Sequence, residues 1–205
     1  MTESRSIKAS NTEASAPPVK GRLGALILAS DGSIENDLYS MLPPKYVANF
    51  SRMNNYETCD ARETDHTSDL IASAKLLREC DGISTIIYGC TSGELTFGRD
   101  LITHTIKAVF PDGTVVTPVQ AAIDAASSSS IRSLYILTPY DTGLNQRMAA
   151  MFEAANIAVS GIYSPPFWTG LDLALIDENE LISVVKTVDL VDSEGLFVPC
   201  NAIPA

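Results

Sequence analysis

Short apolar runs alternate with stretches of helical periodicity along most of the chain. Residues 23–29 and 83–89 are apolar runs of strand length, typical of strands that are buried in a parallel sheet. Between such runs, apolar positions recur every three or four residues, as they do on the buried face of a helix. The pattern predicts an α/β fold in which helices cover a parallel sheet.

The predicted elements follow one another with Gly and Pro at their ends. In the first half they are a strand at 23–29, a helix at 34–42, a strand at 46–50, a helix at 68–79, a strand at 83–89, a helix at 101–109, a strand at 114–116 and a helix that begins at Pro118. Proline fits the first turn of a helix, which supports the last of these predictions.

The second half of the chain repeats the first at an offset of 110 residues: Cys90 matches Cys200, and Asp31 matches Asp141. Apolar positions keep this offset without a gap: Leu26-Ile27 and Ile136-Leu137, Ile34 and Leu144, Leu38 and Met148, Val47 and Ile157, Ile86-Ile87 and Leu196-Phe197. The repeat predicts two similar lobes, 21–130 and 131–205, related by a pseudo-twofold axis. The alternative is a chance match between two βαβ units.

The repeat is incomplete in the second half. Residues 91–130 have almost no counterpart, because the sequence given stops at Ala205, about 35 residues early by the same offset. We expect either a fragment or a second lobe that lacks its last strand and helix. The second possibility would expose a sheet edge, which would favour a homodimer.

Composition narrows the class of partner. The chain has 14 Lys and Arg against 25 Asp and Glu, which gives a net charge of −11. An acidic chain is a poor match for nucleic acid or an anionic membrane surface, and no apolar run approaches the ~20 residues that span a bilayer. Residues 1–20 mix Glu with Ser, Thr, Ala and Pro, which predicts a disordered leader without a signal peptide. We expect a cytoplasmic protein that acts on a small molecule.

Two of the four cysteines carry the candidate chemistry. Their spacing fits neither a disulfide scaffold nor a zinc site. Cys90 and Cys200 each end a predicted strand, and ligands of α/β sheets bind at the carboxyl ends of strands. The pseudo-twofold axis would make these two thiols face each other across one pocket. The alternative for Cys90 is a buried core thiol, which is the preferred interpretation for Cys59 and Cys80.

Three motifs in this order resemble the cofactor-independent Asp/Glu racemase superfamily, in the branch of maleate cis-trans isomerases, arylmalonate decarboxylases and ectoine-utilisation proteins. They are Tyr88-Gly-Cys-Thr-Ser-Gly93, Leu137-Thr-Pro-Tyr140 and Phe197-Val-Pro-Cys200, with Leu28-Ala-Ser-Asp-Gly-Ser-Ile-Glu35 as a looser fourth. The resemblance covers residues 23–205. It implies a two-lobed enzyme that needs no cofactor or metal and acts on a small carboxylate.

Carried over residue by residue, the resemblance implies that Cys90 is a nucleophile or base and that Cys200 is an acid or base. Thr91, Ser92 and Tyr140 would bind a substrate carboxylate. Asn201, at a position where the family commonly has Thr or Gly, would also donate to a carboxylate. Arylmalonate decarboxylases resemble this layout but retain only the second-lobe cysteine, so the presence of both favours isomerisation or racemisation over decarboxylation.

Two routes remain open. In a maleate-isomerase-like route, the Cys90 thiolate adds to an activated double bond, the adduct rotates, and elimination gives the trans isomer while Cys200 supplies and recovers the proton. In a racemase-like route, one thiolate removes a Cα proton and the other thiol returns one to the opposite face. Both routes require low thiol pKa values and a dry cleft.

Asp31 separates these routes. Maleate isomerases typically have Asn at this position, and an ionised Asp31 would repel a dicarboxylate. The same carboxylate would attract the ammonium group of an amino acid or of an N-acylated diamino acid. The alternative is that Asp31 caps the helix that begins near Ser33, and it could also do both.

The remaining residues add little to the chemistry. His66, which precedes a predicted helix, is expected at the surface or in the cap of that helix, and His104 is expected to be exposed on a helix. Two histidines without a nucleophile elbow argue against a catalytic triad, and no GxGxxG or phosphate loop follows a predicted strand. The rival from a different class is a non-catalytic binding or sensor protein for a small carboxylate on the same fold.

Overall fold

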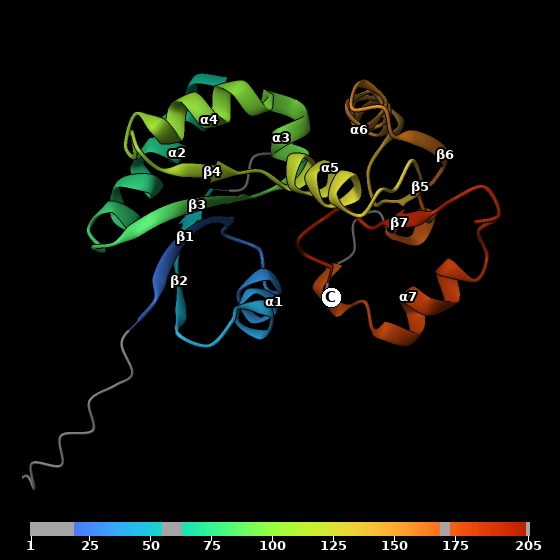
Figure 1. The fold of residues 1–205 in the computed structure, drawn as a ribbon, viewed down its shortest axis with the longest axis horizontal. Coiled ribbons are helices and arrows are strands. Elements are labelled where there is room, and N and C mark those ends of the chain that lie inside the picture. Colours follow the sequence, from blue (N-terminus) through green and yellow to red (C-terminus); the bar gives the residue numbers. More distant parts are fainter. Residues whose placement is uncertain (1–18, 55–62, 169–172, 204–205) are drawn as a thin grey trace, which may run out of the picture.

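The strands of the protein form two parallel sheets. The structure is a computed structural model that describes residues 19–54, 63–168 and 173–203. The first sheet has the strand order β2-β1-β3-β4 and the second the order β6-β5-β7. Figure 1 shows the two sheets beside each other, each flanked by helices. The predicted α/β class is therefore confirmed.

The chain forms these elements in order. The first half contains β1 (Gly21–Leu28), α1 (Ile34–Met41), β2 (Tyr46–Met53), α2 (Glu63–Arg78), β3 (Ile83–Gly89), α3 (Thr91–Phe97), α4 (Arg99–Lys107), β4 (Thr114–Val116) and α5 (Pro118–Ser128). The second half contains β5 (Ser133–Leu137), α6 (Thr142–Ala154), β6 (Ala158–Tyr163), the short 3-10 helices η1 (Pro166–Trp168) and η2 (Leu173–Leu175), α7 (Glu178–Val185) and β7 (Gly195–Phe197). Within the described part of the chain, no helix is both long and apolar enough to cross a membrane.

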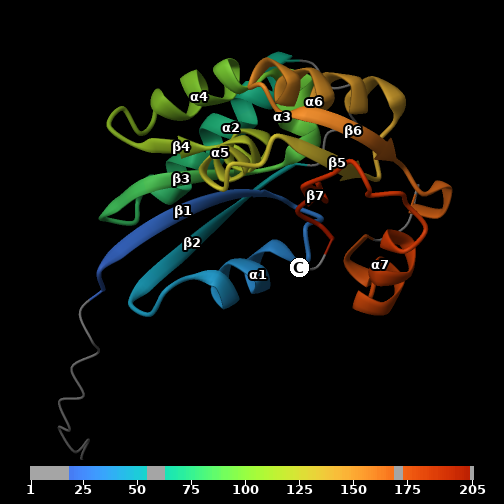
Figure 2. The same ribbon diagram turned by 45° about the vertical axis from the view of Figure 1, so that its right-hand side comes forward.

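Both faces of each sheet are packed against helices. In the first sheet, α2 and α4 cover the face that contains Leu26, and α1 packs on the face that contains Ile27. In the second sheet, α5 and α6 pack on the face of Ile136, and α7 packs on the face of Leu137. Figure 2 shows the same layers from a second direction. Because α5 comes from the first half of the sequence, its packing on the second sheet ties the two halves together.

The structure confirms that the second half repeats the first. The order β2-β1-β3 recurs as β6-β5-β7. The helix caps recur as well: the Oδ1 atom of Asp31 accepts a hydrogen bond from the backbone N–H of Ile34 at 3.0 Å, and that of Asp141 accepts one from Leu144 at 2.9 Å. The same turn chemistry therefore starts α1 and α6.

The gapless offset is wrong for the first strand of each lobe. Leu26 faces α2 and α4, whereas Ile136, its expected counterpart, faces α6, which corresponds to α1. Neighbouring residues of a strand point to opposite faces of a sheet, so the match shifts by one residue and Leu26 corresponds to Leu137. The loop between β5 and α6 is accordingly one residue shorter than the loop between β1 and α1.

Several local predictions differ from the structure. The segment that follows Cys90 forms helix α3, which is not among the elements predicted from the sequence. Gly98 separates α3 from α4 with a φ of 84°, a left-handed conformation that glycine adopts without steric cost. Helix α2 begins at Glu63, earlier than predicted. Cys59 and the predicted leader, except for its last two residues, lie outside the described residues.

Helix α3 is held from two sides. The buried carboxylate of Glu94 accepts hydrogen bonds from the Thr117 hydroxyl at 2.6 Å and from the Val119 N–H at 2.7 Å, and so caps the start of α5. On the other side, the Arg147 guanidinium of α6 donates to the carbonyl oxygen of Leu95 at 3.2 Å. Since α3 follows β3 directly, these contacts fix the end of β3 relative to the second sheet.

We expect Asp141→Ala to lower the free energy of unfolding by about 1 kcal/mol, because it removes the side-chain cap of α6. Urea unfolding followed by circular dichroism measures the change. Glu153→Ala, an exposed position at the other end of α6, is the matched control and should change the value by less than about 0.5 kcal/mol. Equal losses in the two variants would contradict the capping role.

Candidate active site

The predicted site residues lie together where the two sheets meet, at the carboxyl ends of their strands. They are Asp31 in the loop after β1, Cys90 directly after β3, Thr91 and Ser92 in the first turn of α3, Tyr140 in the loop after β5, and Cys200 and Asn201 in the loop after β7. Hydrogen bonds and charge interactions connect every one of them to at least one other member of this group. Each lobe therefore supplies one cysteine to a shared site.

Cys90 forms the N-terminal cap of α3. Its backbone is extended, with a φ of −150°, and its Sγ atom accepts a hydrogen bond from the N–H of Gly93 at 3.3 Å. The hydroxyl of Ser92 lies 3.5 Å from the same sulfur. The side chain is 8% exposed. The thiol is thus buried, with hydrogen-bond donors directed at its sulfur.

Glycine is required at position 93 because the site is crowded there. A Cβ atom at this position would lie 3.1 Å from the Cys90 sulfur and would overlap the Tyr88 hydroxyl. The absence of a side chain lets the Gly93 N–H and the Tyr88 hydroxyl approach the thiol together. This explains the Gly that follows Cys-Thr-Ser in the first motif.

Cys200 has a different backbone conformation from its counterpart. Its φ of 97° lies in the left-handed region, which is costly for a residue with a side chain and is found at sites that the surrounding structure holds in place. Its thiol interacts with the N–H of Ala202 and the hydroxyl of Tyr140. The two thiols are therefore equivalent in sequence but held differently.

The two lobes are joined directly at the site. The Thr91 hydroxyl donates a hydrogen bond to the Oδ1 atom of Asn201 at 3.0 Å. The Tyr140 hydroxyl interacts with the side chains of Thr91 and Cys200. Ser33 adds a third connection, with its hydroxyl donating to the backbone oxygen of Ala202 at 2.9 Å.

Burial controls the protonation of both thiols. Desolvation raises the pKa of Cys90 and of Cys200, and the nearby Asp31 carboxylate raises both further. The charge of the Cys90 thiolate also raises the pKa of Cys200. Hydrogen bonds from Ser92 and the Gly93 N–H act in the opposite direction on the pKa of Cys90. The low thiol pKa values that both routes require are therefore not found in this structure. Burial also raises the pKa of Tyr140, which stays a neutral hydroxyl.

Asp31 has the capping role that is the alternative to binding an ammonium group. Its Oδ1 atom accepts hydrogen bonds from the N–H groups of Ser33 and Ile34, both at 3.0 Å. The Arg52 guanidinium donates to the Asp31 backbone oxygen at 2.8 Å, which fixes the loop. Its carboxylate is also close enough to raise the pKa of both thiols. Binding of an ammonium group by Asp31 stays a prediction.

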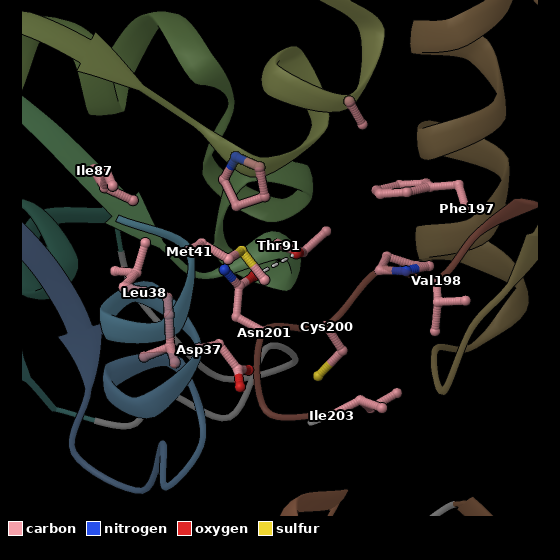
Figure 3. Close-up of a pocket in the computed structure, with 14 residues that line it drawn as sticks. Asp37, Leu38, Met41, Ile87, Thr91, Phe197, Val198, Cys200, Asn201 and Ile203 are labelled. Atoms are coloured by element: carbon pink, nitrogen blue, oxygen red, sulfur yellow. Dashed lines mark hydrogen bonds between the residues drawn. The ribbon is translucent and has the colours of Figure 1, made fainter. Parts of the chain in front are cut away.

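A cavity of about 350 Å³ opens beside the second-lobe half of the site. Thr91, Cys200 and Asn201 belong to its lining, together with mainly apolar side chains from α1, α5 and the loop after β7. Figure 3 shows the Thr91–Asn201 hydrogen bond and the side chain of Cys200 at this cavity. Cys90 is not part of the lining. A ligand in the cavity would therefore contact Cys200 before Cys90.

The prediction for His66 is wrong and the one for His104 is right. His66 is buried at 3% exposure and its Nε2 atom lies 3.2 Å from the Tyr88 hydroxyl, whereas His104 is exposed on α4. Successive side chains of a strand point to opposite faces, so Tyr88 lies on the same face as Cys90. This spacing could have identified Tyr88 as a neighbour of the thiol. The polar sequence around His66 gave no such signal.

The site has no cluster of metal ligands among the described residues. Across residues 19–54, 63–168 and 173–203, no three His, Cys, Asp or Glu side chains gather in a way that could hold a metal ion. The groups that converge on the site are thiols, hydroxyls, an amide and a carboxylate. This set can bind and orient a carboxylate and can move protons.

No protein-family model and no curated protein matches this sequence. Solved structures do match. A maleate isomerase from Pseudomonas putida S16, solved with maleate, has a TM-score of 0.74 and 15% sequence identity, over 90% of this chain and 80% of that one. The chain has the maleate isomerase fold.

Two further structures share the maleate isomerase fold. A Nocardia farcinica maleate cis-trans isomerase variant with a covalently bound succinylcysteine intermediate matches with a TM-score of 0.76 and 14% identity, over 90% of this chain and 80% of that one. Unliganded arylmalonate decarboxylase matches with a TM-score of 0.67 and 19% identity, over 89% and 78% of the two chains. Both belong to the superfamily that the motifs resemble, so that resemblance is confirmed at the level of the fold.

We expect Asp31→Asn to make both thiols more reactive near pH 8. The substitution removes a negative charge that disfavours the thiolates and retains a side chain that can cap α1. Alkylation of Cys90 and Cys200 by iodoacetamide, followed by peptide mass spectrometry across a pH series, should become about two- to threefold faster on the rising part of each profile. Asp141→Asn, the same change at the cap of α6, is the control and should leave both profiles in place. Unchanged profiles in Asp31→Asn would refute the charge effect.

Proposed function

We propose that this protein is a cofactor-independent isomerase or racemase of a small carboxylate, with Cys90 and Cys200 as its catalytic residues. The observation that carries the proposal is the convergence of one thiol from each lobe on a site bridged by Tyr140. Two thiols on separate lobes can approach a bound carbon from two sides. The maleate isomerase fold supports the same chemistry.

The proposed reaction is proton transfer at the carbon next to a carboxylate. The thiolate of one cysteine takes the Cα proton. The electron pair of the broken C–H bond moves into the carboxylate and forms an enolate. The thiol of the other cysteine then gives its proton to the opposite face of the carbon. Protons balance, because one thiol is gained and one is lost in each turnover.

Hydroxyl and amide groups would hold the carboxylate during this transfer. Thr91, Ser92 and Tyr140 carry hydroxyl donors, and Asn201 carries side-chain N–H donors. Donors positioned on the carboxylate stabilise the charge that develops on it as the enolate forms. Because Thr91 and Asn201 bond to each other across the lobes, a substrate would have to separate or replace that contact to lie between the thiols.

Asp31 favours a substrate that also carries an ammonium group. Its Oδ1 atom is occupied by the α1 cap, and the second carboxylate oxygen provides the negative charge for a cation. The charge lies near both thiols, so the cation would be bound beside the reacting carbon. An amino acid or an N-acylated diamino acid has the required pair of groups.

A maleate-type route is the second candidate, favoured by the fold and by the succinylcysteine captured in a neighbour. The Cys90 thiolate would add to one alkene carbon while the Cys200 thiol protonates the other. Rotation about the new single bond, loss of that proton to Cys200 and expulsion of the thiolate would give the trans isomer. This route requires a dicarboxylate to bind near Asp31, which opposes it.

Proton NMR in deuterated water tests these alternatives with a panel of aspartate, glutamate, N-acyl diamino acids, maleate and an arylmalonate. We expect deuterium to enter at Cα of a substrate that carries an amine, and the exchange rate to fall by about 100-fold or more in Cys90→Ala and in Cys200→Ala. Cys80→Ala, a cysteine outside the site, is the control and should retain the exchange.

Other outcomes of this panel separate the rivals. Conversion of maleate to fumarate would support the addition route and overturn the role of Asp31, and loss of carbon dioxide from the arylmalonate would support decarboxylation. Stabilisation of the protein by a carboxylate without exchange or turnover would leave a binding or sensor protein. Exchange that survives both cysteine substitutions would overturn the two-thiol mechanism.

A further inference from the structure

A buried histidine and a buried tyrosine adjoin Cys90 in the core of the first lobe. Tyr88 lies two residues before Cys90, so both side chains leave β3 on the face covered by α2 and α4. Tyr88 is 0% exposed and His66 of α2 is 3% exposed. A core needs no polar atoms at these positions, and burying them is costly unless they bond to each other. Their arrangement therefore calls for a specific explanation.

These polar groups form a chain that ends at the thiol. The Nε2 atom of His66 lies 3.2 Å from the hydroxyl oxygen of Tyr88. The Tyr88 hydroxyl in turn adjoins the Cys90 sulfur, since a single Cβ atom at position 93 would contact both. The His66 ring stacks on Phe97 with 3.9 Å between centroids and an angle of 3° between planes. Phe97 belongs to α3, so the helix that Cys90 caps also sets the orientation of the imidazole.

The protonation states follow from burial. Desolvation lowers the pKa of His66 to about 4 and raises the pKa of Tyr88, so both are neutral near pH 7. When His66 carries its proton on Nε2, it donates to the Tyr88 oxygen, and Tyr88 is left to donate its own proton to the sulfur. In the other tautomer, Tyr88 would donate to His66 and the sulfur would lose this donor.

We propose that Tyr88 donates a hydrogen bond to the Cys90 thiolate and that His66, in its Nε2–H form, positions Tyr88 for this. Tyr88 contacts the reacting sulfur, whereas His66 acts through Tyr88 and is a positioning residue. The inference rests on the proposed function only in taking the Cys90 thiolate as the reactive form. We call this pair of hydrogen-bonded side chains, His66 and Tyr88, the relay. Neither of them gives up a proton, and their effect is to change how readily the Cys90 thiol ionises.

The relay opposes several groups that disfavour the thiolate. Cys90 faces the carboxylate of Asp31, and Glu94 of α3 adds a further carboxylate near Tyr88. On the second lobe, Cys200 and Tyr140 face the same sulfur. Asp69 lies near His66 on α2. A neutral donor is the kind of group that can stabilise a thiolate here without placing another buried charge in the core.

The test is the ionisation of Cys90, measured by the Cβ chemical shift of ¹³C-labelled cysteine across a pH series, with the signal assigned from Cys90→Ala. We expect Tyr88→Phe to move the midpoint to higher pH, so that the thiolate fraction below the midpoint falls about tenfold, as for loss of a charge-assisted hydrogen bond. A purely structural role predicts the opposite sign, because loosened packing would hydrate the thiol and lower its pKa.

Substitutions of His66 test the second link. His66→Phe should retain the stacking on Phe97 and move the midpoint in the same direction as Tyr88→Phe, by less. His66→Gln should restore most of the wild-type midpoint, since its side-chain amide can donate to Tyr88. The double variant with Phe at both positions should shift no further than Tyr88→Phe alone, because the relay acts as one unit.

Tyr135→Phe and His104→Gln are the matched controls and should leave the midpoint unchanged. An unchanged or lowered midpoint in Tyr88→Phe would overturn the relay, and so would a midpoint in His66→Gln equal to that in His66→Phe. If Tyr88→Phe does not fold, the two His66 variants decide the question. The titration needs no substrate, so absence of turnover with the expected shifts would count against the proposed function and leave the relay standing.

Discussion

The hydrogen bond between Thr91 and Asn201 is the contact on which the geometry of the site depends. Thr91 directly follows Cys90, after a strand of the first sheet, and Asn201 directly follows Cys200, after a strand of the second sheet. A hydrogen bond of 3.0 Å between them therefore fixes how the two thiols approach each other. Parallel strands deliver functional residues to one edge of their own sheet, and a second contact is needed to bring two such edges together. The bond from Ser33 to the Ala202 carbonyl supports the same junction from the loop after β1.

Closure of this junction has two opposing effects on the chemistry. Exclusion of water strengthens the electrostatic effect of each donor in the site, which helps to stabilise an enolate. The same exclusion disfavours the thiolate that must form first, and it raises the pKa of both cysteines. The donors gathered around Cys90, from Ser92, Gly93 and Tyr88, offset part of that cost. The crowding that requires glycine at position 93 follows from the need to place several donors around one sulfur atom.

The strands, and the placement of Cys90 and Cys200 after strands, were predictable from the sequence because their signals are local. An apolar run bounded by Gly defines β3, and the strand ends locate Cys90 and Cys200 without knowledge of the packing. Helix α3 was not predicted because Thr, Ser and Gly at its start favour caps and turns, and its helical form depends on contacts with α5 and α6. The burial of His66 likewise arises from tertiary contacts, among them those with Tyr88 and Phe97.

The register error in β1 has a related cause. Both residues of Leu26-Ile27 and of Ile136-Leu137 are apolar, because these strands are buried on both faces. A shift of one residue therefore leaves the apolar pattern intact while exchanging the two faces. Only the packing of α1 and α6 reveals which residue faces which helix. The offset of 110 residues does hold for the strands that precede the cysteines. Ile87 faces α1, and Phe197, its counterpart at this offset, faces the corresponding helix α6.

The two thiols show how a repeated fold can acquire unequal halves. Cys90 has an extended backbone, caps a helix and lies against the buried Tyr88, whereas Cys200 has a φ of 97° and belongs to the lining of a cavity. Proton transfer through two thiols requires one to be ionised while the other is protonated. Identical surroundings would give the two thiols equal tendencies to ionise, so the different backbone and donor arrangements provide a physical basis for assigning them different starting states.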